Sequence, residues 1–171
     1  ALKIYRDLVE KNPDVYLPSL AASCNNLATL LYNTGSFKEA EELSRETLKI
    51  YRDLVEKNPD AYLPSLAASC NNLATLLRDT GSFKEAKELY RETLKIYRDL
   101  VEKNPDVYLP DLAISCSGLA ILLRNTGSFK EAKKLYREAL KIRRELAEKS
   151  PDAYLPDLAI SCSGLAILLR N

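Results

Sequence analysis

The cysteines are the residues of this chain best suited to hold a metal or to act as nucleophiles. There are four of them, spaced 46 residues apart, and the sequence contains no histidine. A structural zinc site needs paired thiolates or imidazoles, and a catalytic serine or cysteine is usually paired with a histidine base. Equivalent atoms in stacked helices lie about 8–10 Å apart, beyond the Cα separation of about 7 Å that a disulfide allows. We therefore interpret all four as buried thiols: Cys24, Cys70, Cys116 and Cys162.

The other reactive residue types also lack a catalytic arrangement. Gly35, Gly81 and Gly127 each follow a predicted helix, and no glycine belongs to a phosphate-binding loop. Acidic residues alternate with basic ones at helical spacing, as in Lys38-Glu39, which is typical of a solvated, ion-paired helix face. The sequence therefore predicts a protein that is not an enzyme and that uses no cofactor and no metal.

Composition limits the classes of partner. The 25 basic and 24 acidic residues leave a net charge of +1, which gives no electrostatic footprint for nucleic acid. No apolar run approaches the roughly 20 residues that span a bilayer, so no membrane interaction is predicted. We expect a cytoplasmic protein, and its 46% of hydrophobic residues is enough to build a core.

Any side chain with a function must be positioned by an internal repeat. The string Leu-Lys-Ile begins at Leu2, Leu48, Leu94 and Leu140, which gives a period of 46 residues. Self-similarity at this period is typical of repeat arrays whose units stack on their neighbours to bury an apolar face. The sequence predicts one domain over residues 1–171, with units that start near positions 2, 48, 94 and 140 and a last unit that is incomplete.

Each unit is predicted to hold two helices, called A and B. In the second unit, helix A is expected to begin near Pro64 and to end before Gly81, because Pro suits a first helical turn and Gly a helix end. Its apolar residues are spaced by 4, 3 and 4 positions: Leu66, Cys70, Leu73 and Leu77.

Helix B of this unit is predicted to open at Ser82-Phe83-Lys84-Glu85, a capping box in which the serine and glutamate side chains satisfy free backbone N–H groups. Its apolar spacing continues through Val101 until Asn104-Pro105 ends it. The same boxes recur at residues 36–39 and 128–131. Because the A-to-B turn is short, the two helices must run antiparallel.

The chain order is a partial helix B, three A–B pairs and a closing helix A. Terminal repeats normally carry a polar outer face. On the closing helix we expect an apolar face that is partly open, formed by Leu158, Cys162, Leu165 and Leu169. The fold class is all-α, a solenoid of antiparallel helix-turn-helix units.

The segments 25–31 (NNLATLL) and 35–40 (GSFKEA) resemble the core of the tetratricopeptide repeat and are most similar to the long-helix repeats of kinesin light chains. The match recurs in the next two units. Two features depart from the family pattern: a cysteine stands where the family usually has a large residue early in helix A, and helix B is longer. The resemblance implies a right-handed superhelix whose concave wall, built mainly from helices A, receives an extended or helical peptide.

The residues opposite the core sector of helix A are the predicted peptide-binding groove, since that face lines the concave wall in the family. Helical rotation at 100° per residue places them there. Between the second and third full units, much of the sequence change lies on or beside this face. The candidate site residues are Asn25, Thr29, Asn71, Thr75, Arg78, Ile114, Ser117, Ile121, Arg124, Ile160, Ile167 and Arg170.

The two halves of this groove differ in chemistry. Asn25 and Asn71 can exchange hydrogen bonds with a peptide backbone, whereas the isoleucines and arginines of the later units favour hydrophobic and acidic ligand residues. The alternative is that the isoleucines pack between adjacent helices A and that the arginines pair with neighbouring acids. Gly118 and Gly164 stand inside helix A, either because of close packing or because of relaxed constraint after duplication.

The leading functional hypothesis is a scaffold that binds a protein or peptide ligand. The first alternative is a self-associating structural repeat, a homo-oligomer that stacks head to tail through its ends. The second is an engineered or isolated repeat fragment with no activity of its own.

Overall fold

The computed structural model describes residues 2–170, apart from the side chains of Leu168 and Arg170. Within this range the chain is helical throughout, with short connections and no strand, so the predicted all-α class is confirmed. The helices are α1 (Leu2–Lys11), α2 (Pro13–Asn33), α3 (Phe37–Lys57), α4 (Pro59–Asp79), α5 (Phe83–Lys103), α6 (Pro105–Asn125), α7 (Phe129–Lys149) and α8 (Pro151–Arg170). Helices α2, α4, α6 and α8 are the predicted helices A, and the other four are the predicted helices B.

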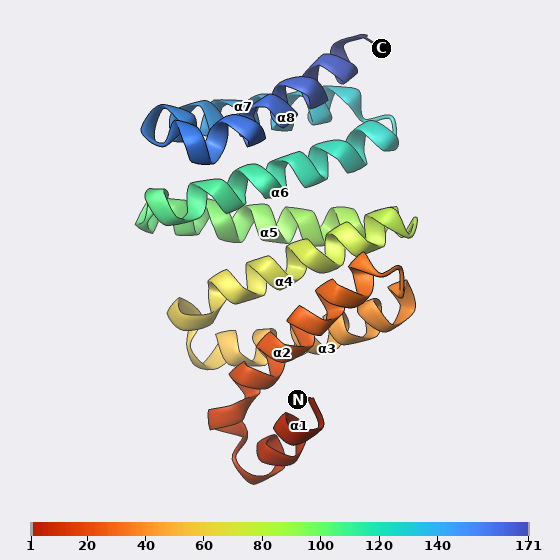
Figure 1. The fold of residues 1–171 in the computed structure, drawn as a ribbon, viewed down its shortest axis with the longest axis vertical. Helices are drawn as coiled ribbons and strands as arrows, with labels where there is room; N and C mark the ends of the chain where they lie inside the picture. The colour runs from red at the N-terminus through yellow and green to blue at the C-terminus, as the bar shows by residue number, and fades with distance from the viewer. Residues whose placement is uncertain (1, 171) are drawn as a thin grey trace. The chain divides into compact units, whose positions relative to one another are not determined.

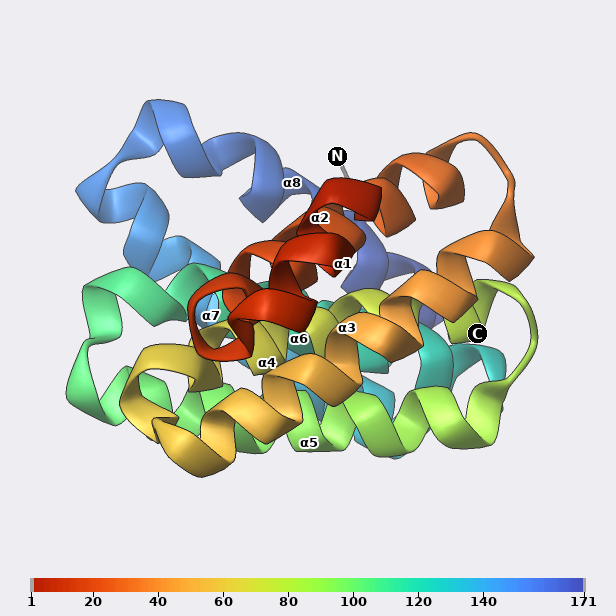
Figure 2. The same cartoon turned by 90° about the horizontal axis from the view of Figure 1, so that it is seen from below.

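The chain divides into two compact units, Ala1–Leu89 and Tyr90–Asn171, and each is described by itself. In unit 1, α2 and α3 lie side by side and antiparallel, and α3 also packs against α4 (Figure 1). The short helix α1 lies against α2 (Figure 2). In unit 2, α7 packs against both α6 and α8 in the same way. A single domain over residues 1–171 stays a prediction.

The predicted start of helix A is wrong by about one and a half turns. Helix α4 begins at Pro59, and Pro64 lies inside the helix. Pro59 occupies the first turn, where its missing N–H removes no helical bond, and the side chain of Asn58 accepts a hydrogen bond from Ala61 N at 3.3 Å. Asn58 also ends α3 by donating its N–H to Leu54 O, so a single residue connects the two helices.

The turn from helix A to helix B depends on a glycine in the left-handed region. Gly81 has φ +90° and donates its N–H to Arg78 O, while Ser82 donates to Leu77 O at 2.7 Å. These two bonds form a Schellman motif, which satisfies the last carbonyls of α4 and favours glycine at the left-handed position. The predicted role of Gly81 as a helix end is confirmed.

The predicted capping boxes are wrong at Ser36 and Ser128. The side chains of Ser36 and Ser128 make no cap hydrogen bond. The backbone N–H of Ser36 already donates to Leu31 O at 2.8 Å, so it is not free to donate to the carboxylate of a glutamate in the next turn. In the box at residues 128–131, Glu131 instead pairs with Arg91 at 3.1 Å. The Schellman motif of one helix therefore replaces the box of the next.

Ion pairs between exposed side chains link successive helices B. In unit 1, Arg6 pairs with Glu46 at 2.8 Å and Arg45 pairs with Glu85 at 2.6 Å. Arg98 pairs with Glu138 in unit 2. All these side chains are about a third or more exposed, so each pair contributes at most about 1 kcal/mol. The prediction of a solvated, ion-paired face is confirmed.

The cysteines are only partly as predicted. All four are free thiols, and Cys24, Cys70 and Cys116 are buried, but Cys162 on α8 is exposed. Burial raises the pKa of the Cys24 thiol to about 11 and that of Cys116 to about 12. The prediction is wrong for Cys162, which has the same position in its repeat as the other three cysteines but is not covered as they are. The residues of α8 that were expected to be open, such as Leu169, are exposed as well, and end-to-end association stays a prediction.

Helix α6 is the one described helix that is long and apolar enough to cross a membrane. Length and composition alone also select the core helices of soluble proteins, so this is weak evidence. In unit 2, α6 packs against α7 and buries eight residues, among them Leu119, Leu122 and Leu123. The core of the unit accounts for these buried residues, whereas Ile114 of the same helix is exposed.

Candidate functional site

Among the polar residues predicted on helices A of unit 1, the threonine hydroxyl groups already bond to their own helices. Thr29 Oγ1 donates to Asn25 O at 3.0 Å, and Thr75 Oγ1 donates to Asn71 O at 3.0 Å. The Asn72 side chain donates from Nδ2 to Asn25 Oδ1 at 3.2 Å, which ties α4 to α2. The threonines therefore offer mainly their acceptor lone pairs and methyl groups to a ligand.

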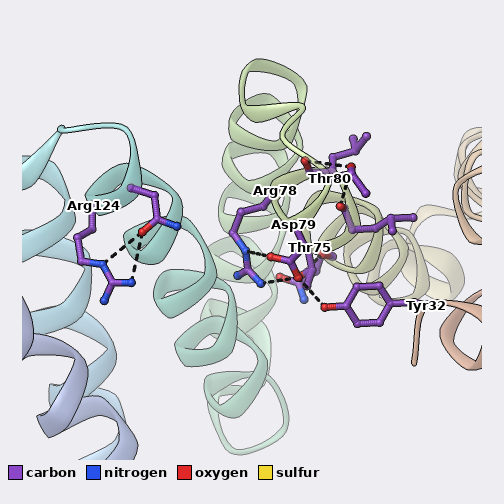
Figure 3. A network of polar contacts seen from close by, with 10 residues as sticks. Tyr32, Thr75, Arg78, Asp79, Thr80 and Arg124 are labelled. Atoms are coloured by element: carbon purple, nitrogen blue, oxygen red, sulfur yellow. Dashed lines mark hydrogen bonds and ion pairs between the residues drawn. The ribbon is translucent and has the colours of Figure 1, made fainter. Parts of the chain in front are cut away.

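A second network joins α2 to the end of α4 in unit 1 (Figure 3). Tyr32 Oη donates to Asp79 Oδ2 at 2.5 Å, and Arg78 Nε donates to Asp79 Oδ1 at 2.7 Å. Burial raises the pKa of Asp79, but the hydrogen bonds from Arg78 and Tyr32 outweigh it and hold the pKa below its ordinary value. The alternative in which an arginine pairs with a neighbouring acid is thus the arrangement found at Arg78.

A pocket of about 150 Å³ opens on this face of unit 1. Helices α2, α3 and α4 each contribute to its lining, with Ser44 from α3. Three of the predicted site residues are among those that line it, whereas Asn71 and Arg78 are not. The lining residues are Asn25, Ala28, Thr29, Tyr32, Asn33, Ser44, Asn72, Thr75 and Leu76.

The pocket exists because of a substitution in helix B that the sequence analysis missed. Ser44 occupies the position in its repeat at which the next two repeats have Tyr90 and Tyr136. Both tyrosines are buried. A serine at this position leaves the volume of a phenol ring unfilled. Comparison of the helices B position by position, as was done for helices A, would have revealed it.

The glycines inside helix A belong to the same exchange. A Cβ atom built on Gly118 would lie 2.6 Å from Cε1 of Tyr90, and one on Gly164 would lie 2.9 Å from Cε1 of Tyr136. Where the tyrosine is replaced by Ser44, the facing residue is Asn72. Close packing, rather than relaxed constraint, therefore explains the two glycines.

On unit 2 the corresponding face is apolar and exposed. Ile114, Ile160 and Ile167 are exposed, so they do not pack as a buried pair between helices A, and Ile121 is half-buried. Arg124 donates to Asn125 Oδ1 at 3.3 Å and forms no ion pair with a described residue. Arg170 was predicted here, but its side chain lies outside the described residues.

A cleft of about 450 Å³ lies between α6, α7 and α8. It brings together five of the predicted residues and leaves out Ile114. The five are Ser117, Ile121, Arg124, Ile160 and Ile167. Arg143, on α7, also lines the cleft and was not predicted. Among the described residues, no group of histidine, cysteine or acidic side chains could hold a metal ion.

Helices α2 to α7 have 21 residues each, and the turns between helices contain Thr-Gly-Ser at one end and Asn-Pro or Ser-Pro at the other. Two tetratricopeptide repeat models match residues 19–99 and 112–152. The chain belongs to the tetratricopeptide repeat family. Such repeats are scaffolds that generally mediate protein interactions and are typically not enzymes.

Solved structures that are similar to this chain include those of BtubC and of a putative kinesin light chain. BtubC (BKLC) from P. vanneervenii is 27% identical with a TM-score of 0.62, over 85% of this chain and 54% of that chain. A variant of the Podosopora anserina putative kinesin light chain with nearly identical TPR-like repeats is 22% identical with a TM-score of 0.68, over 99% and 76% of the two chains. Another structure of that protein is 23% identical with a TM-score of 0.64, over 86% and 67%.

The tetratricopeptide chain thus spans little more than half the length of BtubC. Comparison with curated protein sequences gives no match. The two structures of the Podosopora protein support the fold alone. The resemblance to the tetratricopeptide repeat that was expected from the segments 25–31 and 35–40 is confirmed, and the similarity to kinesin light chain repeats is confirmed at the level of the fold.

Proposed function

We propose that this tetratricopeptide chain is a scaffold that binds a peptide segment of another protein along the face of its helices A. The observation that carries the proposal is the pocket beside Ser44. The next two repeats fill this position with a buried tyrosine, Tyr90 or Tyr136. Unit 1 instead keeps a pocket of about 150 Å³ with polar and apolar walls.

The size of the pocket suggests what enters it. A protein cavity of about 150 Å³ can hold a benzene ring. Its rim carries the amides of Asn25 and Asn72, which can exchange hydrogen bonds with a peptide backbone or a polar ring substituent. The proposed contact is one ring-sized side chain of the peptide in the pocket, with the peptide backbone over the amides. Burial of such an anchor residue in a pocket is the usual origin of a binding hot spot.

The double variant Ser44→Tyr/Asn72→Gly tests this proposal. It introduces the pair that Tyr90 and Gly118 form in the next repeat, so it fills the pocket with a combination that the fold already accommodates. Peptides are selected on the wild-type chain from a random display library, and their affinities are measured by isothermal titration calorimetry. We expect the double variant to bind them about tenfold or more weakly, because the anchor side chain loses its site.

The matched control is Lys95→Ala, which changes an exposed side chain on α5. It should bind the selected peptides as the wild type does. Equal affinity of the wild type and the double variant, with both folded by circular dichroism, would show that the pocket is not the binding site. Failure of the wild type to select any peptide would reject the peptide-binding function.

A further inference from the structure

Arg143 is a buried cation at a position where the preceding helices B have a phenol. The equivalent residues are Tyr51 and Tyr97. Arg143 is 7% exposed, and Tyr51 and Tyr97 are 8% and 4% exposed, so the charge lies as deep as the rings that it replaces. Burial of an ion is unfavourable unless an opposite charge or several hydrogen bonds compensate it.

The partners of Arg143 in unit 2 are neutral. Its Nη1 donates to Ser117 Oγ at 3.0 Å and also to Ser161 Oγ. Ser117 Oγ in turn donates to the backbone carbonyl of Ala113, which is also neutral, so this chain of hydrogen bonds contains no negative charge. Among the described residues Arg143 forms no ion pair, and Asp157 acts on it only through space. Burial lowers the pKa of Arg143, but its guanidinium remains charged at neutral pH.

The residues around Arg143 indicate which ligand group would pair with its guanidinium. Ser117, Ser161 and Arg143 line the unit 2 cleft, and the other walls include Ile121, Ile160 and Ile167. The observed bonds use one of the guanidinium nitrogens, whereas the group can present five N–H donors in a planar fork. A carboxylate matches this fork in shape and in charge. The isoleucines suit an aliphatic group attached to that carboxylate.

We propose that the unit 2 cleft binds a carboxylate carried on an aliphatic group, with the carboxylate on Arg143 and the aliphatic part against the isoleucines. One buried cation between apolar walls matches a single negative charge better than a doubly charged phosphate. The proposal deepens the peptide-binding function and rests on it for the claim that the carboxylate belongs to a peptide. Binding of a small carboxylate does not depend on that function.

Titration of the full chain with 4-methylpentanoate, followed by amide chemical shifts at constant ionic strength, tests the site directly. Its neutral counterpart 4-methylpentanamide is titrated in parallel. We expect the acid to bind with shift changes in α6, α7 and α8, and the amide to bind about tenfold or more weakly, because hydrogen bonds to a charged group are lost. Equal binding of the acid and the amide would overturn the proposal.

The variant Arg143→Tyr introduces the residue that the chain itself uses at this position, as in Tyr97, and is therefore expected to fold. It should lose the preference for the acid. Arg144→Tyr removes the same charge from the neighbouring exposed position and should keep that preference. An acid preference that survives in Arg143→Tyr, or that disappears in Arg144→Tyr, would contradict the assignment of the carboxylate to Arg143.

Short peptides then distinguish the two sources of a carboxylate. Acetyl-Ala-Leu with a free C-terminus, compared with its C-terminal amide, reports an α-carboxylate. Acetyl-Leu-Asp amide reports an acidic side chain. Binding of either acid, lost in Arg143→Tyr, assigns the source. If 4-methylpentanoate binds and neither peptide acid does, the peptide part of the proposal is wrong. Loss of pocket binding in Ser44→Tyr/Asn72→Gly leaves these results unchanged, so the two proposals fail separately.

Discussion

Replacement of Gly118 by asparagine is expected to lower the free energy of unfolding by about 2–3 kcal/mol, in the range that overpacking of a core costs. The first added atom would lie 2.6 Å from the ring of Tyr90, which is fully buried and cannot move aside freely. The amide of the new asparagine would also lose its hydrogen bonds to water without gaining a partner in the protein. Chemical denaturation followed by circular dichroism measures the loss.

The double variant Gly118→Asn/Tyr90→Ser provides the control, because it copies the pair formed by Asn72 and Ser44 in unit 1. Tyr90→Ser alone is expected to cost about 3 kcal/mol or more through the cavity that it leaves. Once the ring is gone, the asparagine at position 118 no longer clashes, so the double variant should lose clearly less than the sum of the two single losses. Additive losses would show that these positions do not exchange as a pair.

Truncation of Leu123 to alanine should destabilise the chain by about 2–5 kcal/mol, whereas the same change at Leu169 should cost about 0.5 kcal/mol or less. The two residues occupy the same position in the repeat, 46 residues apart. Leu123 is 0% exposed within unit 2, and Leu169 on α8 is 56% exposed. Thermal unfolding of the two variants measures the difference. Similar losses would mean that repeat position, rather than packing against neighbouring helices, sets the contribution.

Periodicity predicted the helices and their order because the same apolar spacing recurs in every unit. Local rules were weaker at the helix ends. Pro64 looked like a first-turn proline, but Pro59 beside Asn58 provides a better start, and the helix continues through the second proline. The capping box at Ser36 failed because its backbone N–H was already bonded to the preceding helix. Such competition between neighbouring motifs is visible only when both helices are in place.

The candidate site was predicted from helices A alone, and this explains what was missed. Ser44 and Arg143 lie on helices B, which were treated as a uniform supporting layer. Each replaces a tyrosine that other repeats have at the same position. Ser44 leaves the unit 1 pocket open, and Arg143 lines the unit 2 cleft. Similarly, Cys162 has the same local sequence as Cys116 but is exposed. A side chain's environment here depends on the next helix in the stack, which the local sequence does not specify.

The most direct test of peptide binding along helices A is to map a library-selected peptide on the wild-type chain by amide chemical shifts. The proposed function predicts that the largest changes occur around the unit 1 pocket, at Asn25, Thr29, Asn72 and Thr75. Changes confined to the outer side of helices B, at exposed residues such as Lys49 and Arg52, would contradict it.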